Sequence, residues 1–499
     1  MRQDRSGGAL EEQSVARGEY KATLRVKLIL FMVCSMKIEA RTQRVRDPVH
    51  GLISFDKNEP VDQLARALID TREFQRLRRI KQLGVSDFVY PGATHTRFAH
   101  CIGVFHTARK LIGIIKKEIE AVGEEFNPRR AETALIAALL HDLGHGPFSH
   151  TFEGVQKARG AKKRHEKWTA DIIRNSAGEI QPLLNSFWKD ESFCEAVAHL
   201  LEVEDPEDIY HAVVSSSFDA DRLDYLRRDR LMTGTGAGAI DFDLLMEHLR
   251  VRAVDLEAPE SDDDPEEQVH VATFCLDAKA LPAAEQFLLA RYTLHEQVYF
   301  HKTTRCIEHL VAKILGLVAD AAAKPGAAKA TGLEKNHPLL RFFAKDGEVV
   351  GNYLELDDVL VLSALERMQA ADSKEIASLA LRLRQRDLYK TLDLRSFGFD
   401  EGRQQRAARK IDAEFKAQVG SGRVFKDEGA AIGIYTQIGG DDERAHKKLH
   451  ILDEATGPTE ISRVSKVVGA LASKAQFTRY YFESESERDQ AKRRKKETA

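Results

Sequence analysis

The sequence predicts a mostly α fold with a smaller α+β lobe at its C-terminal end. Apolar residues recur at three- and four-residue steps from about residue 60 to residue 320, which is typical of amphipathic helices. From about residue 410 the pattern is mixed, with the strand-like segments GAAIGIYTQI, KLHILD and TRYYF. The chain has 499 residues, 43% of them hydrophobic, which is enough to bury a substantial core.

The individual elements follow from the same periodicity. Helices are expected within residues 61–70, 105–122, 131–143, 218–231, 284–315, 354–368 and 376–392. VHVATFCLD (269–277) predicts a strand after the acidic loop EAPESDDDPEEQ. The Ala- and Gly-rich stretch 319–338 predicts a loose connection.

These patterns divide the chain into four parts. Residues 1–35 precede Met36, which would make a natural start, and we expect them to form a disordered N-terminal extension. A helical core is expected over 36–325 and a C-terminal α+β lobe over 326–482. The charged tail 483–499 is expected to be disordered.

The composition disfavours several functional classes. Lys and Arg total 75 and Asp and Glu total 78, a formal charge of −3, so no overall positive field favours nucleic acid as a partner. We interpret the terminal KRRKK run as solubilising. Five scattered cysteines without CxxC spacing indicate a reducing compartment and no zinc–thiolate site. The early apolar run LILFMVC is too short to span a bilayer, so we expect a cytoplasmic protein.

Histidines concentrate in one part of the chain. Seven of the 18 lie between residues 95 and 165, three of them in HDLGHGPFSH (141–150). An apolar helix ends there, because Gly144 permits a turn that a β-carbon would hinder and Pro147 stops the helix. His141 and Asp142 therefore leave the helix end toward a pocket.

A metal site at this pocket needs ligands from elsewhere in the chain. TRFAH supplies His100, and FDADRLDY supplies Asp219 or Asp221. Imidazole and carboxylate together suit a divalent Mn, Fe, Zn or Ni ion. A lone His-Asp pair is usually structural, but the additional histidines make the metal site the favoured interpretation.

The chain resembles the HD-domain phosphohydrolases, and within them the dNTP triphosphohydrolases. The motifs, in family order, are RDPVHGLISF, IDTREFQRLRRIKQLG, YPGATHTRFAHCIGV, HDLGHGPFSH, FDADRLDYLRRD and RYTLHEQVYFHK. They look most like the animal enzymes that join a sterile-alpha-motif domain to an HD domain, although no sterile-alpha-motif domain is visible here. The resemblance implies that the helical core is an HD phosphohydrolase catalytic core.

The resemblance also implies site residues. It maps the metal ligands onto His100, His141, Asp142 and Asp221, and so selects Asp221 over Asp219. It maps the histidines around the α-phosphate onto His145, His150 and His165. Glu153 stands where the animal enzymes have Asp and bacterial dGTP triphosphohydrolases have Glu, and we keep it as catalytic.

Substrate-binding residues are expected on two helix faces and near the metal. Arg97 and Arg222 occupy family positions for cations that contact phosphate. Arg222, Tyr225 and Asp229 share one helix face. A second face is expected to carry Arg291, His295, Tyr299 and Lys302. By resemblance, Gln82, Asp229 and Tyr299 hold the deoxyribose, and Leu83 lies near its 2′ carbon and excludes a hydroxyl.

The resemblance implies regulation as well. Asp70, Gln75 and Arg78 match a guanine-recognising set at an allosteric site between subunits. Leu244 and Gln43 replace a family arginine and lysine, so we expect altered occupancy or specificity. A homo-oligomer, dimer or tetramer, is expected, with GTP or a dNTP as regulator. Helix salt-bridge partners are the alternative interpretation of these residues.

The predicted activity is a metal-dependent conversion of dNTP and water to deoxynucleoside and inorganic triphosphate, with Mg accompanying the nucleotide. Its role would be dNTP pool control or phage defence. Hydrolysis of another, signalling nucleotide is the first alternative. A non-catalytic nucleotide sensor or nucleic-acid-binding protein is the second.

Overall fold

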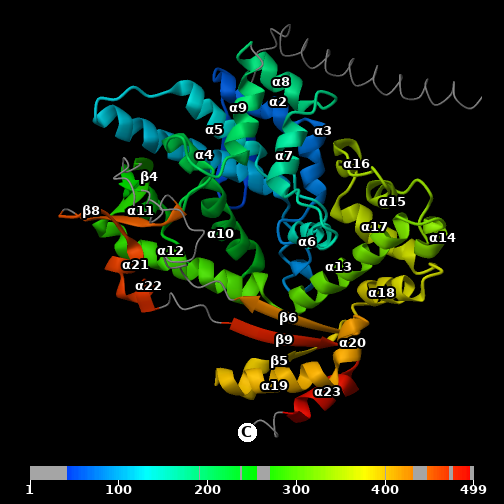
Figure 1. Ribbon diagram of the computed structural model, residues 1–499. Coiled ribbons are helices and arrows are strands. Elements are labelled where there is room, and N and C mark those ends of the chain that lie inside the picture. The colour runs from blue at the N-terminus through cyan, green and yellow to red at the C-terminus, as the bar shows by residue number, and fades with distance from the viewer. Residues whose placement is uncertain are drawn as a thin grey trace, which may run out of the picture.

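A body of helices forms most of the molecule (Figure 1), so the expected mostly α fold with a smaller α+β region is confirmed. The structure, a computed structural model, describes residues 42–189, 192–236, 239–255, 270–398, 400–430, 447–453, 455–470 and 476–494. The predictions for 1–35, for the whole acidic loop and for most of GAAIGIYTQI lie outside these residues.

The N-terminal half begins with an antiparallel hairpin and continues as helices. The hairpin strands are β1 (Gln43–Asp47) and β2 (Gly51–Phe55). The helices are α2 (Pro60–Ile69), α3 (Arg72–Arg76), α4 (Arg97–Ala121), α5 (Pro128–Leu140), α6 (His150–Ala158), α7 (His165–Ile173), α8 (Ile180–Phe187), α9 (Ser192–Glu202) and α10 (Ala220–Thr233).

Two of these helices show why the sequence places the site where it does. In α5 every residue from Thr133 to Leu140 is buried, because the run TALIAALL has no polar face. Asn127 caps its start and Pro128 occupies the first turn. Helix α4 packs against both α5 and α10 (Figure 1), so the C-terminal end of α5 meets the starts of the other two.

The expected long helix at 284–315 is broken. Helix α12 (Leu281–Leu294) passes into a π-helical turn, η5 (His295–Tyr299), and α13 (Lys302–Ala322) begins anew after it. His301 caps α13, since its Nδ1 accepts from the backbone N–H of Thr303 at 3.2 Å. The π turn and the restart shift the helical phase, so the residues before and after them do not share one continuous face.

Two sheets complete the fold. One has the order β3-β4-β7-β8, built from Leu249–Asp255, His270–Asp277, His450–Asp453 and Gly457–Glu460, with β4 and β7 parallel. The other is antiparallel in the order β5-β9-β6, built from Lys390–Asp393, Gln476–Phe482 and Val424–Ala430. Helices α19 (Glu401–Glu414) and α23 (Glu485–Arg493) cover one face of the second sheet (Figure 1).

The remaining α-helices have between 4 and 12 residues. They are α11 (Phe242–Glu247), α14 (Ala327–Thr331), α15 (Pro338–Phe343), α16 (Val350–Tyr353), α17 (Asp358–Met368), α18 (Lys374–Gln385), α20 (Lys416–Gly420), α21 (Ile461–Val464) and α22 (Lys466–Ala470).

Three local expectations differ from the structure. The stretch 319–338 contains the end of α13 and all of α14, and the segment 376–392 ends in β5. The tail is not disordered at 485–493, because a capping box between Ser484 and Glu487 starts α23 and Ala491 is buried against the lobe.

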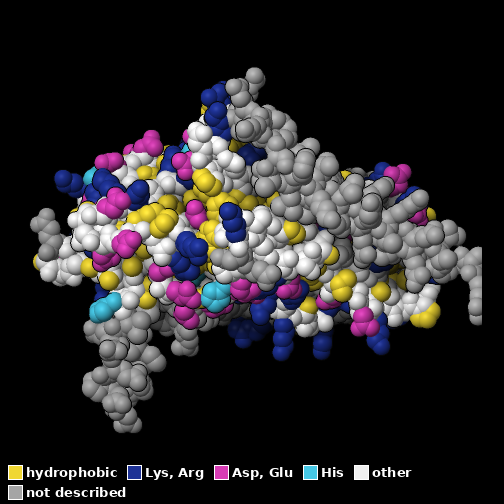
Figure 2. Space-filling view, turned by 90° about the horizontal axis from the view of Figure 1, so that it is seen from above, with side chains coloured by type: hydrophobic (Ala, Val, Ile, Leu, Met, Phe, Trp, Pro, Cys, Tyr) yellow, Lys and Arg dark blue, Asp and Glu magenta, His cyan; other side chains and the backbone are white. Residues whose placement is uncertain are grey.

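The hydrophobic core has two parts. The larger cluster runs from β2 through the helices to α18 and also includes residues from β7 and β9, so no break in the core coincides with the expected boundary at 325/326. The smaller cluster joins β5, β6 and β9 to α19 and α23. No helix in the described ranges is long and apolar enough to cross a membrane. Figure 2 shows positive and negative side chains intermixed over the visible face.

Candidate metal centre and substrate cavity

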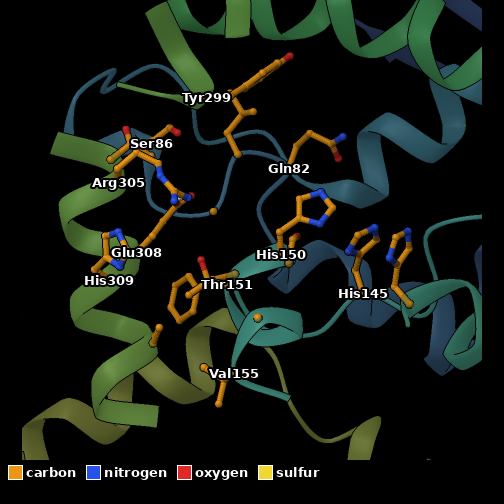
Figure 3. A pocket seen from close by; sticks show the side chains of 18 of the residues that line it. Gln82, Ser86, His145, His150, Thr151, Val155, Tyr299, Arg305, Glu308 and His309 are labelled. Carbon is orange, nitrogen blue, oxygen red and sulfur yellow. The ribbon is translucent and has the colours of Figure 1, made fainter. Parts of the chain in front are cut away.

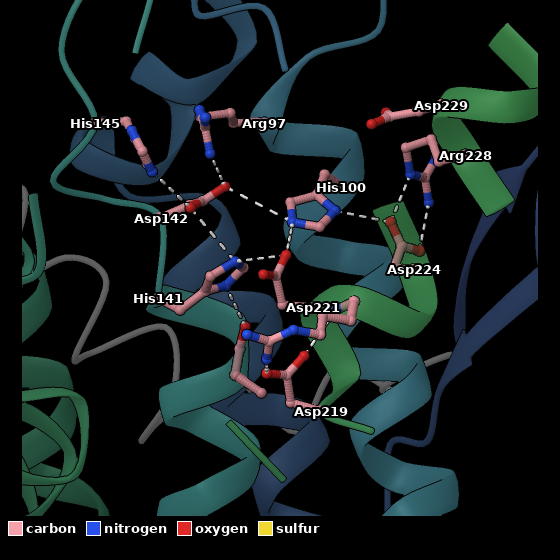
Figure 4. Close-up of polar contacts among 12 residues, drawn as sticks. Arg97, His100, His141, Asp142, His145, Asp219, Asp221, Asp224, Arg228 and Asp229 are labelled. Carbon is pink, nitrogen blue, oxygen red and sulfur yellow. Dashed lines mark hydrogen bonds and ion pairs between the residues drawn. The ribbon is translucent and has the colours of Figure 1, made fainter. Parts of the chain in front are cut away.

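Two histidines and two carboxylates from three helices converge at the end of α5 (Figure 4). His100 Nε2 lies 2.9 Å from Asp221 Oδ1 and 3.8 Å from Asp142 Oδ2. His141 Nε2 lies 3.4 Å from Asp142 Oδ1 and 3.7 Å from Asp221 Oδ1. The four side chains expected to hold a metal are therefore brought together.

The outer nitrogen of each ring is already bound, which fixes its orientation. His100 Nδ1 contacts Asp224 Oδ2 at 2.8 Å, and His141 Nδ1 donates to the carbonyl of Ala138 at 2.9 Å. Both Nε2 atoms are buried and face the carboxylates of Asp142 and Asp221. Two inward-facing imidazole nitrogens and two carboxylates form a donor set that fits a divalent transition metal.

The carboxylates also control the charge of this cluster. Burial alone would lower the pKa of His100, but Asp221 and Asp224 raise it to about 9. Burial alone would also lower the pKa of His141, but the charge of Asp142 outweighs the effect of burial and raises this pKa. The carboxylates therefore favour positive charge on the two imidazoles, and a divalent cation bound at these atoms would take the place of those protons.

The sequence pattern alone left either Asp219 or Asp221 as a metal ligand, and the structure gives the two residues different surroundings. Asp219 caps α10 by accepting from the backbone N–H of Arg222 at 2.8 Å, and its other oxygen pairs with the Arg222 guanidinium. Burial raises the pKa of Asp219 to about 6. Asp221, two residues later in the first turn of α10, points toward His100 and His141 (Figure 4).

The HDLGHGPFSH loop is shaped by close packing as well as by turns. A β-carbon on Gly144 would lie 2.1 Å from the carbonyl of His165, so glycine is required for the approach of α7 and not for a left-handed conformation. The left-handed positions are instead Phe148 and Ser149, with φ of 54° and 51°. Backbone strain of this kind is common at functional loops.

Three more histidines and an acid lie beside the candidate metal ligands. The rings of His145 and His165 are stacked with centroids 4.1 Å apart, and His145 Nε2 lies 3.1 Å from Asp142 Oδ1. Glu153 Oε2 lies 3.3 Å from His165 Nδ1 and 3.5 Å from His150 Nδ1. The His150 side chain is 77% exposed, so it faces the open cavity.

The protonation of this group follows from its contacts. Hydrogen bonds from His150 and then His165 hold the pKa of Glu153 far below its usual range, so it is ionised at every working pH. Burial, and after it the charge of Arg97, lowers the pKa of His145. His145 is therefore neutral near pH 7, stacked on His165 and 3.1 Å from Asp142.

The site opens into a cavity of about 1020 Å³ (Figure 3). Arg97 lines it and donates to Asp142 Oδ2 and to Ser149 Oγ, the latter at 2.9 Å. Tyr299 lines it too and donates to Asp229 Oδ2 at 2.6 Å, while His95 Nε2 contacts Asp229 Oδ1 at 2.8 Å. The predicted substrate-binding residues that line the cavity are Gln82, Leu83, Arg97, Tyr225, Asp229, His295 and Tyr299.

Three predicted substrate residues are not among those lining the cavity. The Arg222 guanidinium turns to Asp219 and to the Ser216 carbonyl. Arg291 and Lys302 stand on either side of the π turn, which removes the continuous face that their spacing implied. In this structure none of the three side chains lines the cavity, and their roles in substrate binding stay predictions.

The predicted allosteric residues lie on the outside of α2 and α3. Asp70 is 64% exposed and pairs with Arg66 at 2.9 Å. Gln75 and Arg78 bind each other, with Arg78 Nε donating to Gln75 Oε1 at 2.8 Å. Gln75 and Arg78 thus form one surface pair and Asp70 another.

Sequence reasoning missed a buried network behind His100. Asp224 contacts His50 Nε2 at 2.6 Å through Oδ1 and pairs with Arg228 through both oxygens. Arg228 also binds Asp47 Oδ2 at 2.8 Å. A β-carbon on Gly103 would lie 2.1 Å from Asp224 Oδ1, so this helical glycine makes room for the network. The only signal in the sequence was that these residues belong to the family-like segments RDPVHG and FDADRLDYLRRD.

The comparisons agree with this geometry. The sequence pattern of the HD domain family matches residues 97–228, and that of the HD associated region matches residues 267–329. Residues 97–228 therefore form an HD domain. This domain carries all four candidate metal ligands, and the associated region contains α12, the π turn and α13.

The chain is also similar to several individual proteins. It is 28% identical to the uncharacterized protein YwfO of Bacillus subtilis over 86% of this chain and 89% of that protein. It is 34% identical to the deoxynucleoside triphosphate triphosphohydrolase SAMHD1 homolog of Dictyostelium discoideum over 54% of this chain, and 31% identical to human SAMHD1 over 58%. The chain spans only about half the length of those two relatives, 48% and 46%.

Solved structures share the whole fold. A phosphohydrolase from Bacteroides thetaiotaomicron superposes with a TM-score of 0.64 at 25% identity, over 89% of this chain and 100% of that one. A hypothetical protein from Aquifex aeolicus gives 0.64 at 26% identity, over 91% and 99%. Together with the site, these likenesses support a metal-dependent hydrolase of the HD class.

Proposed function

We propose that the protein is a metal-dependent dNTP triphosphohydrolase, converting dNTP and water to deoxynucleoside and inorganic triphosphate. The observation that carries this proposal is that one cavity joins the candidate metal ligands to a polar set suited to a sugar. Arg97, His145 and the metal ligands lie on one side, and Gln82, Asp229 and Tyr299 line the same space. Similarity to named dNTP triphosphohydrolases supports it.

The proposed metal ligands are His100, His141, Asp142 and Asp221. A divalent Mn, Fe, Zn or Ni ion bound by them would supply a Lewis acid that offsets charge on the phosphate oxygens. Magnesium is proposed to accompany the nucleotide. Arg97 adds a fixed positive charge on the same wall, and its contact with Asp142 holds the guanidinium in place for phosphate.

The histidines would bind and protonate the substrate. In the reaction, water adds to the α-phosphorus, the bond to the 5′ oxygen breaks, and that oxygen takes up a proton to become the deoxynucleoside hydroxyl. His150 faces the cavity and is held by Glu153, so we assign it the donation of that proton. Glu153 orients His150 and His165, because an always-ionised carboxylate cannot itself deliver a proton.

His145 is assigned a different task. Because it is neutral and stacked on His165, it is proposed to bind a phosphate oxygen through hydrogen bonding without carrying charge. Tyr299 and Asp229, already bonded to each other, would hold the deoxyribose 3′ hydroxyl. Leu83 would fill the space beside the 2′ carbon and exclude ribonucleotides.

Regulation, assembly and cellular role extend this proposal. Asp70, Gln75 and Arg78 would bind a regulatory GTP or dNTP at a contact between copies of the chain in a dimer or tetramer. A cytoplasmic enzyme of this kind would act in dNTP pool control or phage defence. Turnover measured with and without GTP, dGTP and dTTP tests the regulatory part, and identical rates throughout would reject it.

The central experiment is product analysis. Protein loaded with Mn²⁺ or Fe²⁺ is incubated with each dNTP singly and in mixtures, and products are separated by ion-exchange chromatography. Equimolar deoxynucleoside and triphosphate are expected. Release of any other phosphate product would favour a signalling-nucleotide hydrolase, and tight binding without turnover would favour a nucleotide sensor.

A further inference from the structure

The cavity extends beyond the proposed reaction centre to a wall formed by α13 and β6, here called the α13 wall. Arg305, Glu308 and His309 of α13 lie across the cavity from His145 (Figure 3). Phe425 of β6 lines the same wall. The C-terminal sheet therefore contributes to the cavity that holds the proposed catalytic groups.

An aromatic column ends at this wall. The rings of Tyr389 and Phe425 are stacked with centroids 5.2 Å apart and planes 19° apart. The rings of Phe425 and His309 follow at 5.4 Å and 13°. Tyr389 is buried, so His309 is the end of the column on the cavity side. A flat ring at the edge of a cavity is a surface on which a nucleobase stacks.

The charges of the α13 wall disfavour a triphosphate. Arg305 is bound by both oxygens of Asp427, at 3.0 and 3.2 Å, and by Glu308 Oε2 at 2.8 Å. Two carboxylates therefore face one guanidinium. Lys313, on the same wall, is paired with Glu375 at 2.6 Å. The wall thus carries no excess positive charge, in contrast to the Arg97 side.

Two groups on this wall can still form hydrogen bonds with a neutral ligand. Glu308 binds Arg305 through Oε2, so Oε1 can accept from N–H groups. Burial raises the pKa of Glu308 against the opposing effect of Arg305, so a further donor would stabilise its ionised form. His309 Nε2 has no hydrogen-bond partner and lies 3.8 Å from Asp427 Oδ1.

We propose that the α13 wall receives the nucleobase of the substrate, with His309 as the stacking surface and Glu308 as the acceptor for N–H groups on the base edge. This inference rests on the proposed function. Guanine presents two adjacent N–H donors and a large ring face, whereas thymine presents one donor and a small face. The enzyme should therefore prefer dGTP to dTTP.

The test compares four variants: His309→Ala, His309→Phe, Glu308→Gln and the matched control Glu375→Gln. Glu375 pairs with a cation of α13 as Glu308 does, but it does not line the cavity. For each, kcat/KM is measured with dGTP and dTTP. Equilibrium binding of the same nucleotides is measured by calorimetry in an Asp142→Asn background, where loss of a proposed metal ligand stops turnover.

The expected results separate stacking from edge recognition. His309→Ala should bind dGTP about tenfold more weakly, and His309→Phe should restore binding because the ring remains. Glu308→Gln should reduce the dGTP-to-dTTP ratio about fivefold or more, because a charged acceptor is replaced by a neutral one. Glu375→Gln should leave the ratio unchanged.

The outcomes distinguish this inference from the function on which it rests. Unchanged affinity in His309→Ala together with an unchanged ratio in Glu308→Gln would overturn the base site, while wild-type dNTP hydrolysis would still support the proposed activity. If the wild type hydrolyses no dNTP but the variants show the expected changes in binding, the base site is supported and the proposed activity is rejected. If His309→Ala is destabilised in thermal melting, His309→Phe and Glu308→Gln decide the question.

Discussion

The metal-side wall of the cavity and the α13 wall are stabilised by different kinds of contact. On the metal side, buried histidines and acids bind one another through a continuous network that reaches Asp224 and Arg228. On the α13 wall, one paired arginine and an aromatic column join a helix to a distant sheet. The first wall thus fixes several buried charged groups in one place, whereas the second neutralises its arginine and presents a flat ring to the cavity.

The largest expected effect separates two neighbouring acids on the metal side. Asp221→Ala should remove bound metal and lower turnover by more than about 100-fold, because a proposed ligand is lost. Asp219→Ala should keep the metal and lower the free energy of unfolding by about 1 to 2 kcal/mol, because a helix cap is lost. Metal analysis by mass spectrometry and urea unfolding measure the two effects. Equal metal content in both variants would contradict the assignment.

A smaller effect on metal binding is expected from Asp224, which contacts the proposed ligand His100. Asp224→Asn should weaken metal affinity about 10- to 100-fold, because Asp224 orients the His100 ring. The measurement is competition with a chelator of known affinity, and thermal melting controls for loss of fold. Wild-type affinity in a folded variant would show that the ring is oriented by other contacts.

A substitution on the α13 wall should change the stability of the protein but not its metal content. Arg305→Met should lower the free energy of unfolding by about 2 kcal/mol, because Asp427 stays buried without its partner. Metal content should match the wild type. Arg367→Met, which removes an ion pair between two exposed side chains, Arg367 and Glu334, is the control and should change stability by less than about 1 kcal/mol. Loss of metal in Arg305→Met would mean that the two walls are coupled.

The smallest effect is a pH dependence on the cavity rim. Burial, and then the charge of Arg291, lowers the pKa of His295 to about 3. The unfolded chain therefore binds more protons below about pH 6.5, so stability falls as pH drops from there toward 3. Urea unfolding at pH 7, 6 and 5 should show a shallower decline for His295→Gln than for the wild type. Parallel declines would exclude a contribution from His295.

The two walls also differ in how well the sequence predicted them. The residues of the metal side could be proposed from the sequence because His141 and Asp142 end a recognisable apolar helix, and because His100 and Asp221 lie in family-like motifs. The sequence could not show that the guanidinium of Arg222 turns to the N-cap residue Asp219 instead of lining the cavity. Periodicity also does not reveal the π turn that separates Arg291 from Lys302.

The α13 wall could not be found in the same way. Arg305 and Asp427 are 122 positions apart, and Phe425 lies on a strand whose pattern carried no chemical signal. Their contact depends on how the C-terminal sheet docks on α13, which is a property of tertiary packing. The mostly α fold was predictable from periodicity, whereas α23 was missed because its capping box lies within a highly charged segment.

The HDLGHGPFSH loop (141–150) is held in place by residues that lie outside the matched HD domain, 97–228. Arg76 donates to the carbonyls of Leu143 and His145, and Tyr353 donates to the carbonyl of Gly144 at 2.6 Å. Asp358 accepts from the backbone N–H of Phe148 at 2.7 Å. A fragment limited to residues 97–228 would leave these carbonyls and that amide without their protein partners. A segment that keeps this loop in its present conformation must accordingly be longer than the matched HD domain and include Arg76, Tyr353 and Asp358.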